Sequence, residues 1–234
     1  MRELHNEWAA RIRDNSQRRI LSVVFLAVIC LAAYVDEFLL QGAFQPSTDA
    51  FPRAISNWDI PVFILINKGL ANFYLGWFFN IVTRLGSTTF LLGVCAVLYA
   101  LGRKRECILL FASIIIGTLL GLPIKLLLPR PRPYVTVPTT IVFDREAGSS
   151  FPSGHSMRSF SFAFVGSKLW PRYSVPLYVL AFLVSFARIY VGQHYPSDVI
   201  AGALVGLLVG YLTARYEPAI TKVSTRLRIL PNRE

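Results

Sequence analysis

Long runs of apolar residues, separated by short polar or basic segments, dominate the amino-acid sequence. A helix needs about 20 mostly apolar residues to cross a lipid bilayer. Six stretches approach that requirement, and they cover residues 20–40, 88–101, 108–128, 155–170, 175–190 and 198–211. The pattern predicts an all-α integral membrane protein with six transmembrane helices.

The first apolar stretch admits two interpretations. A basic pair, Arg18 and Arg19, precedes it, which is also how a signal peptide begins. However, the preceding segment is long and residues 31–34 make a poor cleavage site, so we favour a membrane anchor. Residues 1–19 carry apolar side chains at helical spacing among arginines. This is typical of an amphipathic helix on the membrane surface or of a frayed tail.

Two other segments depart from the simple pattern. Residues 41–86 mix apolar residues with prolines and tryptophans, and we expect interfacial helices that lie against one membrane surface or dip into it. In the fourth stretch, Ser156, Arg158 and Ser159 interrupt the apolar run. Polar residues at such positions usually face the interior of a helical bundle or water.

Composition agrees with a membrane protein. Hydrophobic residues make up 54% of the 234 residues and charged residues 16%. A nucleic-acid-binding protein would account for the net charge of +11 but not for so much apolar sequence. The three cysteines, Cys30, Cys95 and Cys107, lie far apart in apolar stretches. They predict buried side chains and neither a zinc site nor a redox pair.

The distribution of basic residues predicts the orientation, because Lys and Arg concentrate in the cytoplasmic loops of membrane proteins. Placing both termini in the cytoplasm puts most of the 24 Lys and Arg residues on that side. We therefore expect a cytoplasmic amphipathic segment at residues 1–19, a six-helix membrane domain at residues 20–214 and a basic cytoplasmic tail at residues 215–234.

Several cations remain on the outer side, and they give the first indication of chemistry. Lys125 lies near the outer end of the third stretch, Arg132 follows in a proline-rich loop, and Arg188 ends the fifth stretch. Each alone is typical of a flanking side chain that reaches toward water. Together they repel one another, so a site that gathers all three is expected to bind an anion. Arginine matches the geometry of phosphate.

The segment Pro152-Ser153-Gly154-His155 comes directly before the fourth stretch. A helix N-terminus offers free backbone N–H groups to an anion, Ser153 adds a hydroxyl donor, and Gly154 allows close approach. An ordinary helix cap would use the same residues. The position of His155 at the helix start favours an anion site, because the imidazole can exchange protons with the bound group.

His194 lies in the short loop before the sixth stretch, and Asp198 opens that stretch. Four residues of turn can bring the carboxylate back to one imidazole nitrogen, which fixes the tautomer and leaves the other nitrogen free to attack. A second role for Asp198 is to cap the helix. The spacing predicts a histidine nucleophile with an orienting aspartate.

Together these motifs resemble the signature of the type 2 phosphatidic acid phosphatase superfamily, a family of lipid phosphate phosphatases. The signature reads Lys-x6-Arg-Pro, Pro-Ser-Gly-His and Ser-Arg-x5-His-x3-Asp. The chain matches it from Lys125 to Asp198, which makes 125–198 the expected catalytic core. Ala187 stands where serine is usual, which removes one hydroxyl donor.

The resemblance implies a role for each matching residue. His194 would attack phosphorus and form a phosphohistidine, Asp198 would raise its basicity, and His155 would protonate the leaving oxygen. The residues expected to hold the phosphoryl oxygens are Lys125, Arg132, Ser153, Gly154 and Arg188. The fixed cations would take the place of a metal ion, so we expect no metal and no cofactor.

Two arginines, Arg130 and Arg158, are additional to the fixed residues of the signature. Arg158 is one turn after His155, and we expect it either to contact a second phosphate or polar headgroup or to pair with Asp144 or Glu146. A second phosphate fits a polyprenyl diphosphate. Phosphatidic acid and phosphatidylglycerophosphate are also open as substrates.

The expected function is hydrolysis of a lipid phosphate within the bilayer, at the extracytoplasmic face of the plasma membrane, without a nucleic-acid partner. A phosphotransferase would use the same phosphohistidine. A non-enzymatic lipid-binding or transport protein would keep the cations but need neither histidine. The vanadium-dependent haloperoxidase relatives are soluble, and the apolar stretches argue against them. The oligomeric state stays open.

Overall fold

A computed structural model of the chain describes residues 27, 31, 51–143 and 145–226. All regular secondary structure in these residues is helical, so the predicted all-α class is confirmed there. The helices are α2 (Arg53–Ile64), η2 (Leu65–Gly69), α3 (Phe73–Arg84), α4 (Thr88–Ala100), α5 (Lys104–Leu127), α6 (Pro133–Thr136), α7 (Gly154–Leu169), η3 (Pro171–Tyr173), α8 (Ser174–Tyr190), α9 (Pro196–Arg215) and α10 (Glu217–Arg226).

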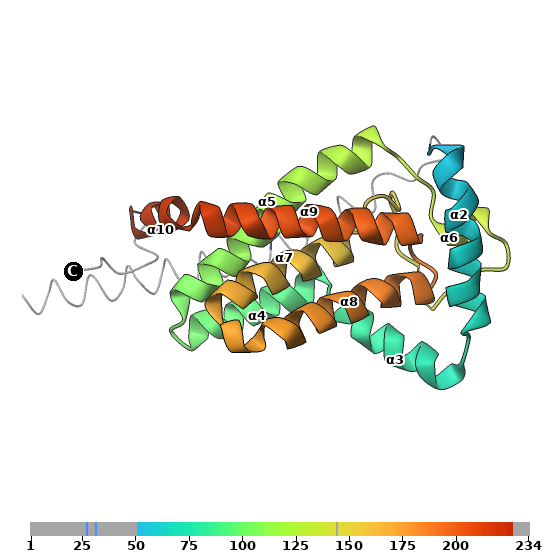
Figure 1. Ribbon diagram of the computed structural model, residues 1–234. Helices are drawn as coiled ribbons and strands as arrows, with labels where there is room; N and C mark the ends of the chain where they lie inside the picture. The colour runs from blue at the N-terminus through green and yellow to red at the C-terminus, as the bar shows by residue number, and fades with distance from the viewer. Residues whose placement is uncertain (1–26, 28–30, 32–50, 144, 227–234) are drawn as a thin grey trace, which may run out of the picture.

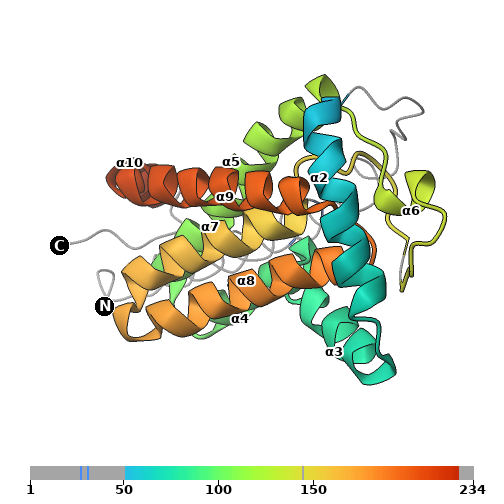
Figure 2. The same ribbon diagram turned by 45° about the vertical axis from the view of Figure 1, so that its right-hand side comes forward.

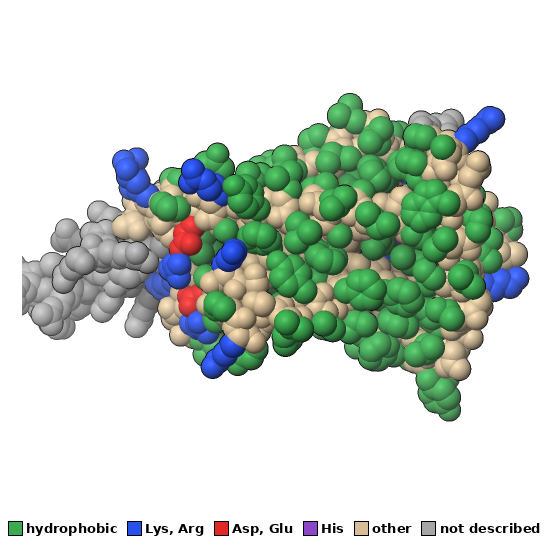
Figure 3. Space-filling view, viewed as in Figure 1, with side chains coloured by type: hydrophobic (Ala, Val, Ile, Leu, Met, Phe, Trp, Pro, Cys, Tyr) green, Lys and Arg blue, Asp and Glu red, His purple; other side chains and the backbone are tan. Residues whose placement is uncertain are grey.

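The long helices run side by side, and α2 lies across one end of the bundle that they form (Figures 1 and 2). On the face seen in Figure 3, hydrophobic side chains cover the middle of the molecule. Lys and Arg side chains gather on that face at the end that carries α10, and few lie at the opposite end. This distribution suits a protein with its middle in lipid, and the chain is an integral membrane protein.

Three described helices are long and apolar enough to cross a membrane, namely α5, η3 with α8 (Pro171–Tyr190) and α9. A fourth candidate is the pair formed by α2 with η2 and by α3, which is bent by 117° and fits either a broken span or a re-entrant loop. The predicted span at residues 20–40 lies outside the described residues, apart from Ala27 and Leu31. The six-span arrangement therefore stays a prediction.

The structure also bears on the expectations for the segment between the first two spans, for the cysteines and for the terminal segments. The helices expected between the first and second spans are present as α2, η2 and α3. Cys95 and Cys107 are buried, as predicted, whereas Cys30 and the segment 1–19 lie outside the described residues. In the basic tail, α10 contacts the start of α5 through an ion pair between Glu217 and Arg105.

The polar helix α7 lies at the centre of the bundle, packed against α5, α8 and α9. Ser156, Ser159 and Ser161 are buried, as the sequence pattern predicts, and Ser156 bonds to neighbouring helices. Ser156 Oγ donates to the Val199 carbonyl oxygen at 2.8 Å, and Ser185 Oγ donates to Ser156 Oγ at 2.9 Å. Because three helices surround α7, its hydroxyl groups avoid contact with lipid.

Glycines on α9 allow it to pack closely against α7. Gly202, Gly206 and Gly210 recur every four residues, so they lie on one face of α9. A Cβ at Gly202 would lie 2.5 Å from the Ser153 carbonyl oxygen, and a Cβ at Gly206 would overlap the Met157 carbonyl oxygen. Small residues at such spacing let two membrane helices approach along their backbones.

The close packing predicts that Gly206→Ala destabilises the protein by about 1–3 kcal/mol, the usual cost of overpacking, because the added methyl group must push α9 away from α7. The matched control is Gly93→Ala on α4, where a Cβ would meet no atom within 4 Å. Thermal unfolding in detergent measures both variants. Equal melting temperatures for the two would contradict the proposed packing.

Candidate active site

The ends of four helices meet beside α2 and α6. The C-terminal ends of α5 and α8 bring Lys125 and Arg188, and the N-terminal ends of α7 and α9 bring His155 and Asp198. A pocket opens between α5 and α7. It is lined by Thr118, Gly121, Leu122, Lys125, Arg132, Glu146, Pro152, Gly154, His155, Met157, Arg158 and His194.

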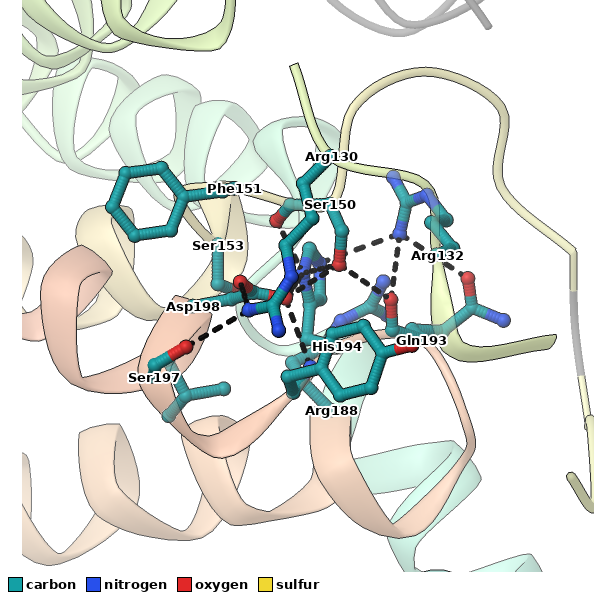
Figure 4. A network of polar contacts seen from close by, with 12 residues as sticks. Arg130, Arg132, Ser150, Phe151, Ser153, Arg188, Gln193, His194, Ser197 and Asp198 are labelled. Atoms are coloured by element: carbon teal, nitrogen blue, oxygen red, sulfur yellow. Dashed lines mark hydrogen bonds and ion pairs between the residues drawn. The ribbon is translucent and has the colours of Figure 1, made fainter. Parts of the chain in front are cut away.

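The contacts of His194 define which of its ring nitrogens carries the proton. Nδ1 lies 2.7 Å from the Ser150 carbonyl oxygen, which can only accept, so Nδ1 must be the donor. Nε2 lies 3.3 Å from Arg132 Nη1, which can only donate. The neutral ring therefore carries its proton on Nδ1 and presents the lone pair of Nε2 toward Arg132 (Figure 4). His194 is also one of the residues that line the pocket.

Asp198 does not make the hydrogen bond to His194 that the sequence predicts. Its Oδ2 is 3.8 Å from Nδ1, because the Ser150 carbonyl oxygen already occupies the near position. The carboxylate accepts from Arg130 Nη1 at 2.7 Å and from Ser150 Oγ at 2.5 Å. It also accepts from the Tyr195 backbone N–H at 2.9 Å. Asp198 thus supports the loop around His194 and caps the start of α9.

Arg188 is buried and incompletely satisfied. Nη1 donates to Thr83 Oγ1 at 3.1 Å, and Nη2 is 2.6 Å from Glu146 Oε2. Nε and Nη2 nevertheless have no aligned hydrogen-bond acceptor among the described residues. Buried donors of this kind are costly unless a partner arrives. They are suited to the oxygens of a bound anion.

The other two predicted cations lie close by, and the backbone of one loop holds both. Arg132 Nη2 donates to the Ala147 carbonyl oxygen at 3.0 Å, and Lys125 Nζ donates to the Ser149 carbonyl oxygen at 3.1 Å. The structure therefore brings Lys125 and Arg132 to the pocket, as the sequence indicated, whereas Arg188 is absent from the lining and reaches it through its ion pair with Glu146.

A carboxylate that the sequence analysis does not place in the site, Glu146, stands among these cations. It is 3.4 Å from Arg132 Nη2 as well as 2.6 Å from Arg188 Nη2, and its Oε1 is 4.0 Å from His155 Nε2. Burial by itself would raise the pKa of Glu146. The charges of Arg188, His155 and Arg132 outweigh burial and hold this pKa well below its usual range. An ionised carboxylate thus occupies part of the anion site.

Comparison with known proteins decides the family. The family model described as PAP2 superfamily matches residues 106–222, half of the chain, and includes all three motifs. The chain belongs to the PAP2 superfamily. This is the membership that the motifs predict.

Relatives within the PAP2 superfamily agree in fold and sequence. An undecaprenyl-diphosphatase of Sulfolobus acidocaldarius is 34% identical over 58% of this chain and 68% of the relative. A lipid A 1-phosphatase of Rhizobium etli is 37% identical over 45% of this chain and 47% of the relative. The crystal structure of LpxE from Aquifex aeolicus matches 72% of this chain and 98% of its own, with 30% identity and a TM-score of 0.64.

The second PAP2 motif is placed partly as expected. Ser153 is fully buried, and its Oγ accepts from the Ser156 N–H at 3.5 Å as the N-cap of α7. It is absent from the pocket lining, so the cap interpretation describes its position. Gly154 does line the pocket, and a Cβ there would lie 3.2 Å from Arg158 Nη1. Glycine therefore leaves room for Arg158, which also lines the pocket and donates to the Gly86 carbonyl oxygen at 3.3 Å.

Sequence reasoning missed several residues around the PAP2 motifs. Glu146, Ser150 and Gln193 lie in loops and contact His194 or Arg132, and Asp59 reaches the site from α2. Asp59 and Glu146 are acidic residues in a sequence with few charges, and this rarity is the feature that could have indicated them as site residues. Nothing in the spacing of Ser150 or Gln193 marks either residue.

The geometry predicts a specific titration of His194. Burial lowers its pKa well below 6.5, and Arg132 and Arg188 lower it further, so the neutral ring is favoured over the protonated one. Nitrogen-15 NMR of labelled protein in detergent can resolve the chain's three histidines. We expect the Nδ1–H tautomer for His194, and an upward pKa shift in Arg132→Gln. A wild-type pKa at or above 6.5 would contradict this arrangement.

Proposed function

We propose that the chain is a membrane phosphatase that hydrolyses a lipid phosphate through a phosphohistidine on His194. The observation that carries the proposal is the unprotonated Nε2 of His194, which faces a pocket lined by cations. The positive charges of Arg132 and Arg188, both of which act on the imidazole of His194, supply the electrostatic half of the same requirement. Phosphoryl transfer depends mainly on positioning and on neutralisation of charge.

The proposed reaction has two steps. In the first, Nε2 forms a bond to phosphorus while the bond from phosphorus to the lipid oxygen breaks, and His155 donates its proton to that oxygen. In the second, water attacks the phosphohistidine, His155 takes a proton from the water, and inorganic phosphate leaves. Lys125, Arg132 and Arg188 stabilise the phosphoryl oxygens in both steps. Both histidines return to their starting protonation states.

We propose a lipid substrate that carries phosphate or diphosphate. The pocket joins a charged end, with Lys125 and Arg158, to apolar side chains on α5 and α7, including Leu122 and Met157. Two of the relatives are named for undecaprenyl diphosphate and for lipid A phosphate. The position of Arg158 in the pocket supports a second phosphate, so a polyprenyl diphosphate is the first substrate to test.

We further propose the topology that the sequence predicts, with six spans, both termini in the cytoplasm and the site at the extracytoplasmic face of the plasma membrane. The basic residues of the α10 end support this orientation. The site lies at the opposite end of the bundle, beside α2 (Figure 1). A lipid headgroup at the outer surface would meet the pocket there.

The mechanism predicts that His194→Ala abolishes phosphate release, because no other described group takes the place of the nucleophile. His155→Ala is expected to lower the rate by about 10²–10⁴-fold, the usual contribution of a general acid, and least for substrates with good leaving groups. The matched control is His5→Ala in the N-terminal segment, which should retain activity.

Release of inorganic phosphate from undecaprenyl diphosphate, phosphatidic acid and phosphatidylglycerophosphate measures these variants. Rapid quenching with phosphorus-32 substrate should trap an acid-labile phosphoenzyme that is absent from His194→Ala. Wild-type activity in His194→Ala would show that the proposed mechanism is wrong.

The reaction is also proposed to need no metal ion. Among residues 51–143 and 145–226, no group of three or more His, Cys, Asp or Glu side chains is arranged to hold one. Phosphate release is therefore expected to be unchanged in excess EDTA. Loss of activity that Mg²⁺ restores would contradict the proposal.

A further inference from the structure

Arg130 lies inside the first PAP2 motif but points away from the pocket that the motif surrounds. It is buried, and it does not line the pocket. Its Nη1 donates to Asp198 Oδ1 at 2.7 Å and to Ser197 Oγ at 2.9 Å, and its Nη2 is 2.8 Å from Asp59 Oδ2 (Figure 4). One arginine therefore joins two buried carboxylates.

Aromatic rings hold the guanidinium of Arg130 on both faces. The ring centroid of Phe51 is 4.1 Å from its central carbon, and that of Tyr195 is 3.9 Å away. Cations stack favourably on such rings, most strongly where water is excluded. The plane of the guanidinium is thus fixed, with Nη1 and Nη2 directed at the two carboxylates.

Asp59 brings α2 into this arrangement. It is fully buried and lies on an otherwise largely apolar helix, far from the PAP2 motifs in the sequence. Besides its ion pair with Arg130, its Oδ1 accepts from the Ser197 backbone N–H at 2.9 Å, and its Oδ2 bonds to Ser197 Oγ. Asp59 therefore contacts both Arg130 and the residue that precedes Asp198.

The charges of this cluster have a consequence for His194. Asp59 and Asp198 carry two negative charges and Arg130 one positive charge, so the cluster has a net charge of −1 beside the imidazole. Attack on phosphorus places positive charge on that ring. Without Asp59, Arg130 would cancel the charge of Asp198, and this cluster would carry no net negative charge beside His194.

We propose that Asp59 and Arg130 are positioning residues of the reaction, which hold the Asp198 carboxylate and keep its negative charge effective at His194. This inference rests on the proposed role of His194 as the nucleophile. It assigns a part in the reaction to α2, which carries none of the family motifs.

The other charged or titratable groups that face His194 are Arg132, Arg188, Glu146, Lys125, His155 and Asp198. None of these changes in Asp59→Asn or Arg130→Gln, so a shift in the titration of His194 in these two variants reports on Asp59 and Arg130. Asp59→Asn removes a negative charge and should lower the pKa of His194. Arg130→Gln removes a positive charge and should raise it.

Steady-state kinetics with undecaprenyl diphosphate supply the second measurement. Asp59→Asn should lower kcat on the order of 10- to 100-fold, a typical cost of misplacing a reacting group. KM should change little, because Asp59 does not line the pocket. Arg130→Lys keeps the charge and should recover part of the activity that Arg130→Gln loses, with the pKa of His194 near its wild-type value. If Arg130→Gln does not fold, Asp59→Asn and Arg130→Lys still test the proposal.

A double-mutant cycle separates positioning from general stability. The effect of Asp59→Asn on kcat should shrink several-fold in an Asp198→Asn background, because Asp59 acts through that carboxylate. The matched control is Asn67→Ala. Asn67 is also buried and lies on the same segment, but it bonds to the Ile141 and Tyr190 carbonyl oxygens instead. Its effect should be the same in both backgrounds.

Two outcomes would overturn the positioning roles. One is an Asp59→Asn effect that is independent of Asp198, as for Asn67→Ala. The other is a loss of thermal stability with no change in kcat or in the titration of His194. In either case an inactive His194→Ala would leave the proposed function standing. Activity in His194→Ala would instead overturn the proposed function itself.

Discussion

Burying cations at the end of an apolar helical bundle carries a large desolvation cost, and this cost dictates the arrangement of the site. An uncompensated charge in such a place destabilises a protein severely, so each arginine needs an anionic partner. Arg130 obtains Asp59 and Asp198, while Arg132 and Arg188 share Glu146. Because these partners come from α2, α9 and the loop before α7, the pairing fastens distant parts of the chain to one another. The local fold of these loops is therefore determined in large part by the need to place a carboxylate beside each of these buried arginines.

The helical frame supplies the precision that loops alone would lack. α7 and α9 start at the same end of the bundle, and the glycines of α9 hold the two backbones close together, so Ser153 and Asp198 lie side by side. The Ser153 N–H donates to the Asp198 carbonyl oxygen at 3.0 Å. The loop after α8 is tied in by Gly192, whose φ of +84° suits glycine and whose missing Cβ leaves room for the Ile141 carbonyl oxygen. His194 follows two residues later, so its ring is presented from a backbone with little freedom.

Periodicity and motif spacing were sufficient to locate the helices and to bring Lys125, His155 and His194 to one end of the bundle. Both rest on regularities along the chain, namely apolar runs, helix starts and fixed intervals. The contact between His194 and the Ser150 carbonyl oxygen could not be derived in this way, because a backbone acceptor has no residue type. The expected bond to Asp198 was wrong for that reason. Asp59 was missed because its partner lies far away in the sequence, and Glu146 was considered only as a partner of Arg158. Only the folded chain shows that Asp59 meets Arg130 and that Glu146 meets Arg132 and Arg188.

The position of Glu146 affects the release of inorganic phosphate from the proposed site. In the proposed reaction, phosphate held by Arg132 and Arg188 would displace this carboxylate, and Glu146 would stay within reach because its backbone is held on both sides. The Glu146 N–H donates to Gln193 Oε1 at 3.3 Å, and Tyr134 Oη donates to the Glu146 carbonyl oxygen at 2.6 Å. When the inorganic product departs, the arginines regain an internal counter-ion instead of facing one another unpaired. Because the Glu146 carboxylate competes for the same arginines, it lowers the affinity of the site for every anion equally. The strongly cationic pocket would therefore not bind the product, inorganic phosphate, so tightly that its release is prevented.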